Sequence, residues 1–227
     1  MKKIFFVLAL FTSISVFGQM RFGIVGTPQV TWLKSDVKLV ETDGIRLGLS
    51  YGLNLEFSFS DNAIFTTGVF INNAGGKLKY NDTTNVFSFE HSDIIDTLPT
   101  GVSITYKTQY LEIPLGLKFK TNEIGYLTYF GQLGLTPMVN ISAKGDSEKP
   151  DLIDNEKIQK EVSLFNLAYH IGAGVEYNLS GNTSLLAAII YTNGFFDITR
   201  NPKGNKTTNV SDKVIMNCVS LKVGVLF

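Results

Sequence analysis

Five charged residues are each flanked on both sides by apolar residues, and they are the side chains best placed to do chemistry together. These residues are Arg21, Glu56, Lys118, Glu176 and Lys222. Three are basic and two are acidic, and a charge that is buried in a protein needs a partner. The pattern predicts a layer of salt bridges in the protein interior. In the barrel that the strand pattern predicts below, this layer would plug the lumen. The alternative is a charged selectivity ring in a channel.

Motifs for catalysis or metal binding are sparse. The chain contains no HExxH, P-loop, GxSxG or CxxC pattern, and the Gly-Ala-Gly at 172–174 lacks the third glycine of a phosphate-binding turn. His91 stands beside Ser92 and Asp93, which are triad residue types, although such neighbours in a polar segment favour an ordinary loop. An acidic run could bind Ca²⁺ loosely but lacks the spacing of a dedicated calcium loop. Its members are Asp146, Glu148, Asp151, Asp154 and Glu156. We therefore expect no enzyme activity, no cofactor and no metal site.

The composition excludes several classes of protein. The chain of 227 residues has 20 Lys+Arg and 20 Asp+Glu, so its zero net charge gives no electrostatic case for a nucleic-acid partner. One cysteine excludes an internal disulfide framework, and two histidines argue against a histidine-rich metal site. An aromatic content of 12% excludes a mainly disordered chain.

Apolar residues alternate with polar or small ones over long stretches, which is typical of strands and not of helices. The alternation is clearest at 45–59, 163–179 and 219–227. We expect strands near 20–33, 45–59, 63–80, 104–120, 126–143, 163–179, 183–196 and 213–227. Pro28, Pro114 and Pro137 fall inside these strands, and because proline cannot donate to the ladder we expect a bulge at each.

The connections fall into two alternating classes. Short links at 60–62, 121–125 and 180–182 alternate with long polar links at 34–44, 81–103, 144–162 and 197–212. Soluble strands usually have about 5–6 residues, whereas these have roughly 14–17. Long strands in even number, with short turns at one end and long loops at the other, are typical of bacterial outer-membrane barrels. The sequence therefore predicts an all-β fold, an eight-stranded antiparallel up-and-down transmembrane β-barrel. The alternative is a soluble lipocalin-like barrel with its apolar face turned inward around a ligand.

The first residues have the pattern of a targeting segment. Lys2 and Lys3 precede an apolar run from Ile4 to Phe11, and Gly18 ends the segment. A basic start, a short apolar run and a small residue at the end are typical of a secretory signal peptide. We predict a signal peptide over 1–18, secretion across the inner membrane and an outer-membrane β-barrel domain over 19–227. The expected location is the outer membrane of a Gram-negative bacterium, with outer-membrane lipid as a partner.

The last residue carries a second kind of signal. Phe227 ends the chain, and Val219, Leu221, Val223 and Val225 precede it on the same face. An outward aromatic residue at the carboxyl terminus resembles the signal by which the barrel assembly machinery recognises its substrates. We therefore expect that machinery to be a partner.

One segment resembles a known family. Residues 110–118 read YLEIPLGLK, and they resemble the YLEIPLLLK segment of PorT-family outer-membrane β-barrels of Bacteroidota. The GAGVEY at 172–177 is similar to a GxGxEY-like strand of that family. The most family-like residues are Tyr110, Leu111, Glu112, Ile113 and Pro114. The resemblance implies an outer-membrane barrel, and one family member is implicated in gliding and type IX secretion.

The sequence thus predicts a non-enzymatic outer-membrane barrel that acts as a structural or surface-binding scaffold. The alternatives are a narrow pore for small solutes, an accessory component of protein export, a soluble ligand-binding barrel, and a membrane enzyme that uses loop residues around His91.

Overall fold

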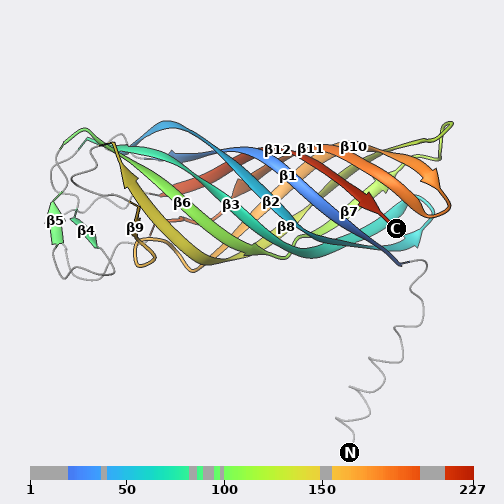
Figure 1. The fold of residues 1–227 in the computed structure, drawn as a ribbon, viewed down its shortest axis with the longest axis horizontal. Coiled ribbons are helices and arrows are strands. Elements are labelled where there is room, and N and C mark those ends of the chain that lie inside the picture. The colour runs from blue at the N-terminus through green and yellow to red at the C-terminus, as the bar shows by residue number, and fades with distance from the viewer. Residues whose placement is uncertain are drawn as a thin grey trace, which may run out of the picture.

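The structure is a long barrel whose strands run obliquely along its length (Figure 1). This computed structural model describes residues 20–36, 40–81, 86–88, 95–97, 100–148, 155–199 and 213–227. The strands are β1 (Met20–Ser35), β2 (Val40–Ser60), β3 (Ala63–Tyr80), β4 (Val86–Ser88), β5 (Ile95–Thr97), β6 (Val102–Glu112), β7 (Leu115–Lys120), β8 (Leu127–Ser147), β9 (Glu156–Lys157), β10 (Phe165–Ser180), β11 (Thr183–Gly194) and β12 (Val214–Leu226). The short strands β4, β5 and β9 lie together at one end of the barrel.

The wall closes on itself, which pairs the backbone groups that an open edge would leave exposed. Ile24 of β1 pairs with Leu53 of β2 on one side and with Val225 of β12 on the other. β6 and β7 share one place in the wall, between β3 and β8. Counting that place once, eight antiparallel strands surround the lumen. The predicted fold class, an eight-stranded up-and-down barrel, is confirmed.

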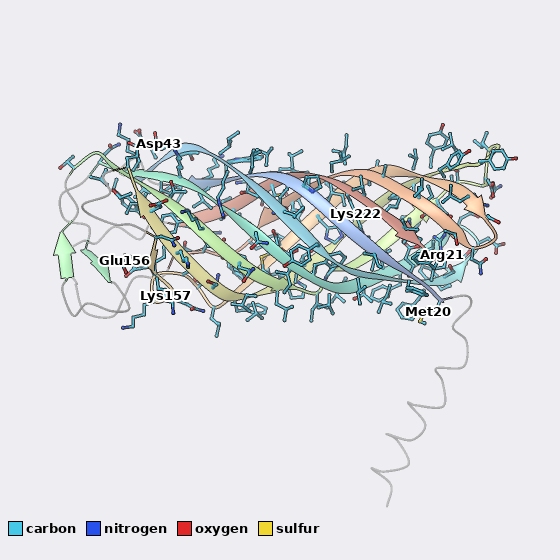
Figure 2. The ribbon with its side chains drawn as sticks, in the orientation of Figure 1. Met20, Arg21, Asp43, Glu156, Lys157 and Lys222 are labelled. Atoms are coloured by element: carbon cyan, nitrogen blue, oxygen red, sulfur yellow. The ribbon has the colours of Figure 1, made fainter. Side chains whose placement is uncertain are left out.

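The two ends of the barrel differ in their connections. The long link expected at 34–44 is wrong, because β1 continues to Ser35 and β2 begins at Val40, so only 36–39 connect them. The turns at 61–62, 125–126 and 181–182 are tight. They lie at the same end as Met20 and the carboxyl terminus, whereas the strand ends that the long connections join lie at the opposite end (Figures 1 and 2).

Apolar side chains cover the outside of the wall. On β2 the outward residues, between 46% and 77% exposed, are Ile45, Leu47, Leu49, Tyr51 and Leu53. The alternate residues Ser50, Asn54 and Glu56 are buried in the lumen. An apolar belt around the outside with polar groups inside is the arrangement of a transmembrane barrel. The lipocalin-like alternative, which requires the apolar face inside, is therefore wrong.

The bulges expected at the three prolines are absent. Around Pro28 and Pro137 the pairing continues without a register shift. At Pro114 the strand is interrupted between β6 and β7, but the register is the same before and after the break, with Glu112 opposite Met138 and Leu115 opposite Leu135. Pro114 and Pro137 meet at this interruption, where Ile113 donates to the Pro137 carbonyl at 3.1 Å. The two residues without N–H groups thus share one gap, so no bulge is needed.

The register shifts lie elsewhere, in the β2–β3, β6–β8 and β10–β11 pairs. One separates Gly44 from Leu49 in the β2–β3 pair, and another lies beside Gln109 in the β6–β8 pair. In the first region Gly75 has φ = 147°, and a Cβ there would lie 1.9 Å from the Tyr106 carbonyl oxygen. This position therefore requires glycine.

Two predictions lie outside the described residues: the signal peptide at 1–18, and the polar segment that contains His91, Ser92 and Asp93. Within the described ranges, no helix has the length and apolar character to cross a membrane.

Candidate functional site: the filled lumen

Four of the five predicted lumen charges meet near the short-turn end, and we call Arg21, Glu56, Lys118 and Glu176 the charge cluster. Arg21 lies 2.6 Å from Glu56 and 3.0 Å from Glu176. Lys118 lies 2.7 Å from Glu56 and also pairs with Glu176. Each carboxylate therefore contacts both cations, and the cluster has no net charge.

The local sequence explains why these side chains meet. Each charged residue stands between two outward apolar residues, so alternation turns it into the lumen. Arg21 and Glu56 are direct cross-strand partners on β1 and β2. Lys118 and Glu176 come from β7 and β10, which lie elsewhere around the wall. The cluster therefore ties separate parts of the wall together across the lumen.

Lys222, the fifth predicted charge, is attached to the cluster indirectly. Its amine donates to Asn54 Oδ1 at 2.9 Å, and Asn54 Nδ2 donates to Glu56 Oε1 at 3.3 Å. Aromatic rings cover both lysines, with Lys118 Nζ 4.3 Å from the centre of Phe130 and Lys222 Nζ 5.8 Å from the centre of Phe70. These cation–π contacts help to hold ammonium groups away from water.

A cavity of about 90 Å³ lies in the lumen beside Lys222, lined by polar side chains together with apolar ones such as Phe70 and Ile190, and we call it the polar cavity for the hydrogen-bonded groups that cross it. A chain of hydrogen bonds crosses it from one wall to the other. Cys218 Sγ donates to Gln29 at 3.2 Å, Gln29 donates to Asn72 at 2.5 Å, and Asn72 donates to Glu112 at 2.6 Å. His170 lies in the same cavity, with its Nδ1 2.9 Å from the Thr136 hydroxyl. Except for Glu112, the residues of this hydrogen-bond chain are uncharged. They were therefore not included in the predicted site, whose lumen residues were selected by their charge. Their inward positions in the alternation were the available signal.

An apolar core fills the lumen toward the long connections. Its largest buried members include Leu33, Leu78, Ile104, Tyr106 and Ile158. Tyr80 and Tyr106 join their hydroxyl groups there. The lumen is thus built in three layers: the charge cluster, the polar cavity and the outer apolar core.

The other predicted site residues are spread over the wall. In the family-like segment, Tyr110 is buried, Glu112 faces the cavity, and Ile113 and Pro114 form the interruption between β6 and β7. Leu111 is half-buried on the outer face. At the carboxyl terminus, Phe227 exchanges two backbone hydrogen bonds with Phe22, at 2.7 and 3.2 Å, and their rings stack at 5.3 Å.

The acidic run does not form a metal site in the part of the chain that the structure describes. Asp146 pairs with Lys107 at 2.7 Å, whereas Asp151 and Asp154 lie outside the described residues. Among the described residues, no group of three or more His, Cys, Asp or Glu side chains could hold a metal ion.

A closed barrel with a lipid-facing apolar belt and a side-chain-filled lumen defines a small transmembrane β-barrel protein. The chain belongs to the outer membrane protein beta-barrel domain family, whose model matches residues 17–200. Membership places it in the outer membrane of a Gram-negative bacterium, in contact with lipid.

Solved barrels are similar at low identity. Neisserial surface protein A is 13% identical, with 90% of this chain and 95% of that chain covered at a TM-score of 0.47. OprG from Pseudomonas aeruginosa is 12% identical, with 93% and 97% covered at 0.47. Ail from Yersinia pestis, in complex with the heparin analogue sucrose octasulfate, is 16% identical, with 92% and 100% covered at 0.40. No curated protein matches the chain.

Proposed function

We propose that this protein is a non-enzymatic scaffold of the outer membrane, plugged against solute flow, that acts through the end carrying its long connections. The charge cluster is the observation that carries the proposal. Its two cations and two carboxylates join β1, β2, β7 and β10, and the Lys118 side chain is only 1% exposed. A selectivity ring would instead present charges of one sign to water.

The orientation follows from the same architecture. Barrels of this kind have short periplasmic turns and longer extracellular loops. In this orientation Met20, the carboxyl terminus and the charge cluster lie toward the periplasm. The apolar core and the long connections lie toward the cell exterior, where a scaffold meets its ligands. The signal peptide at 1–18 and recognition of Phe227 by the barrel assembly machinery complete this proposal.

The polar cavity favours a narrow pore as the second candidate. Its lining of hydroxyl, amide and charged groups could hold water, and displacement of the charge cluster would open a path from the periplasm. The outer apolar core, with Leu33, Leu78 and Ile158 each fully buried, argues for the scaffold because it blocks the remaining path.

The PorT-like segment at 110–114 supports a finer assignment, to the PorT-like barrels of Bacteroidota. Because one member of that family is implicated in type IX secretion, an accessory role in protein export is a further candidate function. Its test is the amount of exported cargo in a strain that lacks the gene, measured beside a strain in which the gene is restored.

Conductance of the refolded barrel in a planar lipid bilayer tests the scaffold against the pore. We expect no stepwise current from the wild-type protein. The variant Lys118→Met/Glu176→Gln, which keeps the cluster neutral, should be equally silent. Regular current steps from the wild-type barrel would refute the plugged scaffold and establish the pore.

A further inference from the structure

A row of lysines crosses the outer surface of the wall near the long connections. Lys107 of β6 is the direct cross-strand partner of Lys144 of β8, and Lys144 is the direct partner of Lys157 of β9. We call these three residues the lysine row. Lys77 of β3 lies diagonally from Lys107, because its own partner is Thr105. Direct partners share one face of a sheet, so the ammonium groups gather on one side of the wall.

Such a row is costly without a counter-ion, since like charges directly opposite each other destabilise a sheet. Asp146 is the one carboxylate within ion-pair distance of the lysine row among the described residues, and it pairs with Lys107 at 2.7 Å. This hydrogen bond holds the pKa of Asp146 below its ordinary value, so the aspartate is an anion. Lys144 and Lys157 have no carboxylate partner in the part of the chain that the structure describes.

Lys79, farther along β3, does not belong with the lysines that lack a carboxylate as a direct cross-strand partner. Glu41 is its direct partner on β2, and Asp43 bonds the Ser103 hydroxyl beside it at 2.5 Å. On the surface over β6, β8 and β9, Lys144 and Lys157 are therefore the lysines without an ion pair among the described residues, and the carboxylates of Glu148 and Glu156 on the same segments lie outside ion-pair distance of them. Figure 2 shows Lys157 and Asp43 at this end of the barrel.

The register also fixes how far the lysine row lies from the apolar belt. Ile71, Leu111 and Val139 are cross-strand neighbours and form the last level at which β3, β6 and β8 all carry an apolar residue, with the exposed Ile141 of β8 just beyond it at the register shift. Two residues farther along, the neighbours are polar: Asn73, Gln109 and Ser142. Gln109 donates to Asn73 at 3.0 Å at this level.

The lysine row lies two residues beyond that polar level, toward the long connections. At about 3.3 Å per residue, four residues from Leu111 to Lys107 span about 13 Å along the strand. A tilt of roughly 40° reduces this to about 10 Å along the membrane normal. Lysine side chains can extend several ångströms back toward the bilayer. The ammonium groups therefore reach the layer of lipid headgroups, which begins where the hydrocarbon ends.

We propose that the lysine row binds the phosphate groups of a phosphorylated glycolipid in the outer leaflet. The inference rests on the proposed orientation, with the long connections outside. A phosphate supplies the missing anion, and its oxygens accept charge-assisted hydrogen bonds from several ammonium groups at once. The neighbouring Ile71, Leu111 and Val139 lie where the acyl chains of the same molecule would pack.

Binding of lipid A to the folded full-length barrel in detergent micelles tests this proposal. The probes are bisphosphorylated lipid A, dephosphorylated lipid A, phosphatidylglycerol and inorganic pyrophosphate. The variant K107Q/K144Q/K157Q removes the lysine row. The matched control K34Q/K120Q/K213Q removes three lysines that lie elsewhere on the barrel, and heat-modifiability checks that both variants fold.

We expect bisphosphorylated lipid A to bind most tightly of the four probes. At about fivefold per lysine, loss of the row should weaken its binding roughly 100-fold, and the control should bind within about twofold of wild type. Three outcomes would overturn the proposal: equal binding of the two forms of lipid A, equal loss in the control, or binding of pyrophosphate or phosphatidylglycerol as tight as that of lipid A.

A single substitution adds a readout that distinguishes binding from a structural role. Because Lys144 stands between two like charges, Lys144→Gln should leave the melting temperature unchanged or raise it in lipid-free detergent. With lipid A present, the same variant should melt below wild type, since a ligand stabilises the state that binds it. A lower melting temperature under both conditions would show a structural lysine and refute the proposal. Conductance of the wild-type barrel bears only on the plug, so the two failures remain distinguishable.

Discussion

Replacing Lys118 with methionine removes one of the two cations that hold Glu56 and Glu176 together. The Lys118 side chain is 1% exposed and contacts both carboxylates. After its loss Arg21 is left to balance two carboxylates, and the cluster changes from neutral to a net charge of −1. Methionine can keep the packing against Phe130, so the electrostatic loss dominates. Removing one partner of a buried pair costs about 3–5 kcal/mol, and this is the loss of unfolding free energy that we expect.

A double-mutant cycle isolates the interaction. Glu176→Gln alone leaves the cluster with a net charge of +1 and should also cost about 3–5 kcal/mol. The double variant Lys118→Met/Glu176→Gln is neutral again, and its cost should be at most about 2 kcal/mol, because replacing both partners avoids an unpaired charge. The coupling between the two sites should then be about 4 kcal/mol or more.

Urea unfolding of the barrel in lipid vesicles measures these free energies. Lys120→Met is the control, since Lys120 is two residues away and makes no ion pair among the described residues. Its effect should stay within about 0.5 kcal/mol. Additive costs in the double variant, or a loss below about 1 kcal/mol for Lys118→Met, would refute the cluster as a neutral buried network.

Three further substitutions test the wall itself. Leu53→Arg puts a charge on the outward face and should cost about 2–4 kcal/mol in vesicles if it lies near the bilayer midplane; an unchanged unfolding free energy would contradict the lipid-facing register. Gly75→Ala should abolish folding into vesicles, because its Cβ would lie 1.9 Å from the Tyr106 carbonyl oxygen. The control Gly26→Ala places a Cβ with nothing within 4 Å and should fold normally. Equal folding yields of the two variants would disprove the requirement for glycine at position 75. Deletion of Phe227 removes its two backbone bonds to β1 and should lower the amount of heat-modifiable barrel in the outer membrane, with normal secretion across the inner membrane; full assembly without it would show that neither closure nor recognition depends on this residue.

Most of the wall was predictable because alternation is a local property of the sequence. The tight turns and the faces of the long strands follow from residues such as Leu53 and Asn54, which lie on opposite sides as expected. The inward direction of Arg21, Glu56, Lys118 and Glu176 follows from the same rule. Their pairing was less certain, since the register between distant strands decides which side chains meet.

What the sequence did not reveal depends on contacts between strands. Pro114 and Pro137 were expected to cause separate bulges, but both lie at a single gap, where Ile113 is opposite Pro137, and only the β6–β8 register shows this. The bulge at Gly75 depends on the closeness of Tyr106. Alternation points the residues of the hydrogen-bond chain from Cys218 to Glu112 into the lumen, but which of them meet depends on the register between strands.

Thiol labelling in intact cells tests the central claim, a barrel that spans the outer membrane with its long connections outside. In a Cys218→Ser background, Lys160→Cys places a thiol at an exposed turn near the long connections, and Asn182→Cys places one in an exposed tight turn at the opposite end. A maleimide reagent too large to cross the outer membrane should label position 160 in intact cells, and position 182 only after permeabilisation. Labelling of 182 but not 160 in intact cells would contradict the orientation, and labelling of both would contradict a membrane-spanning barrel.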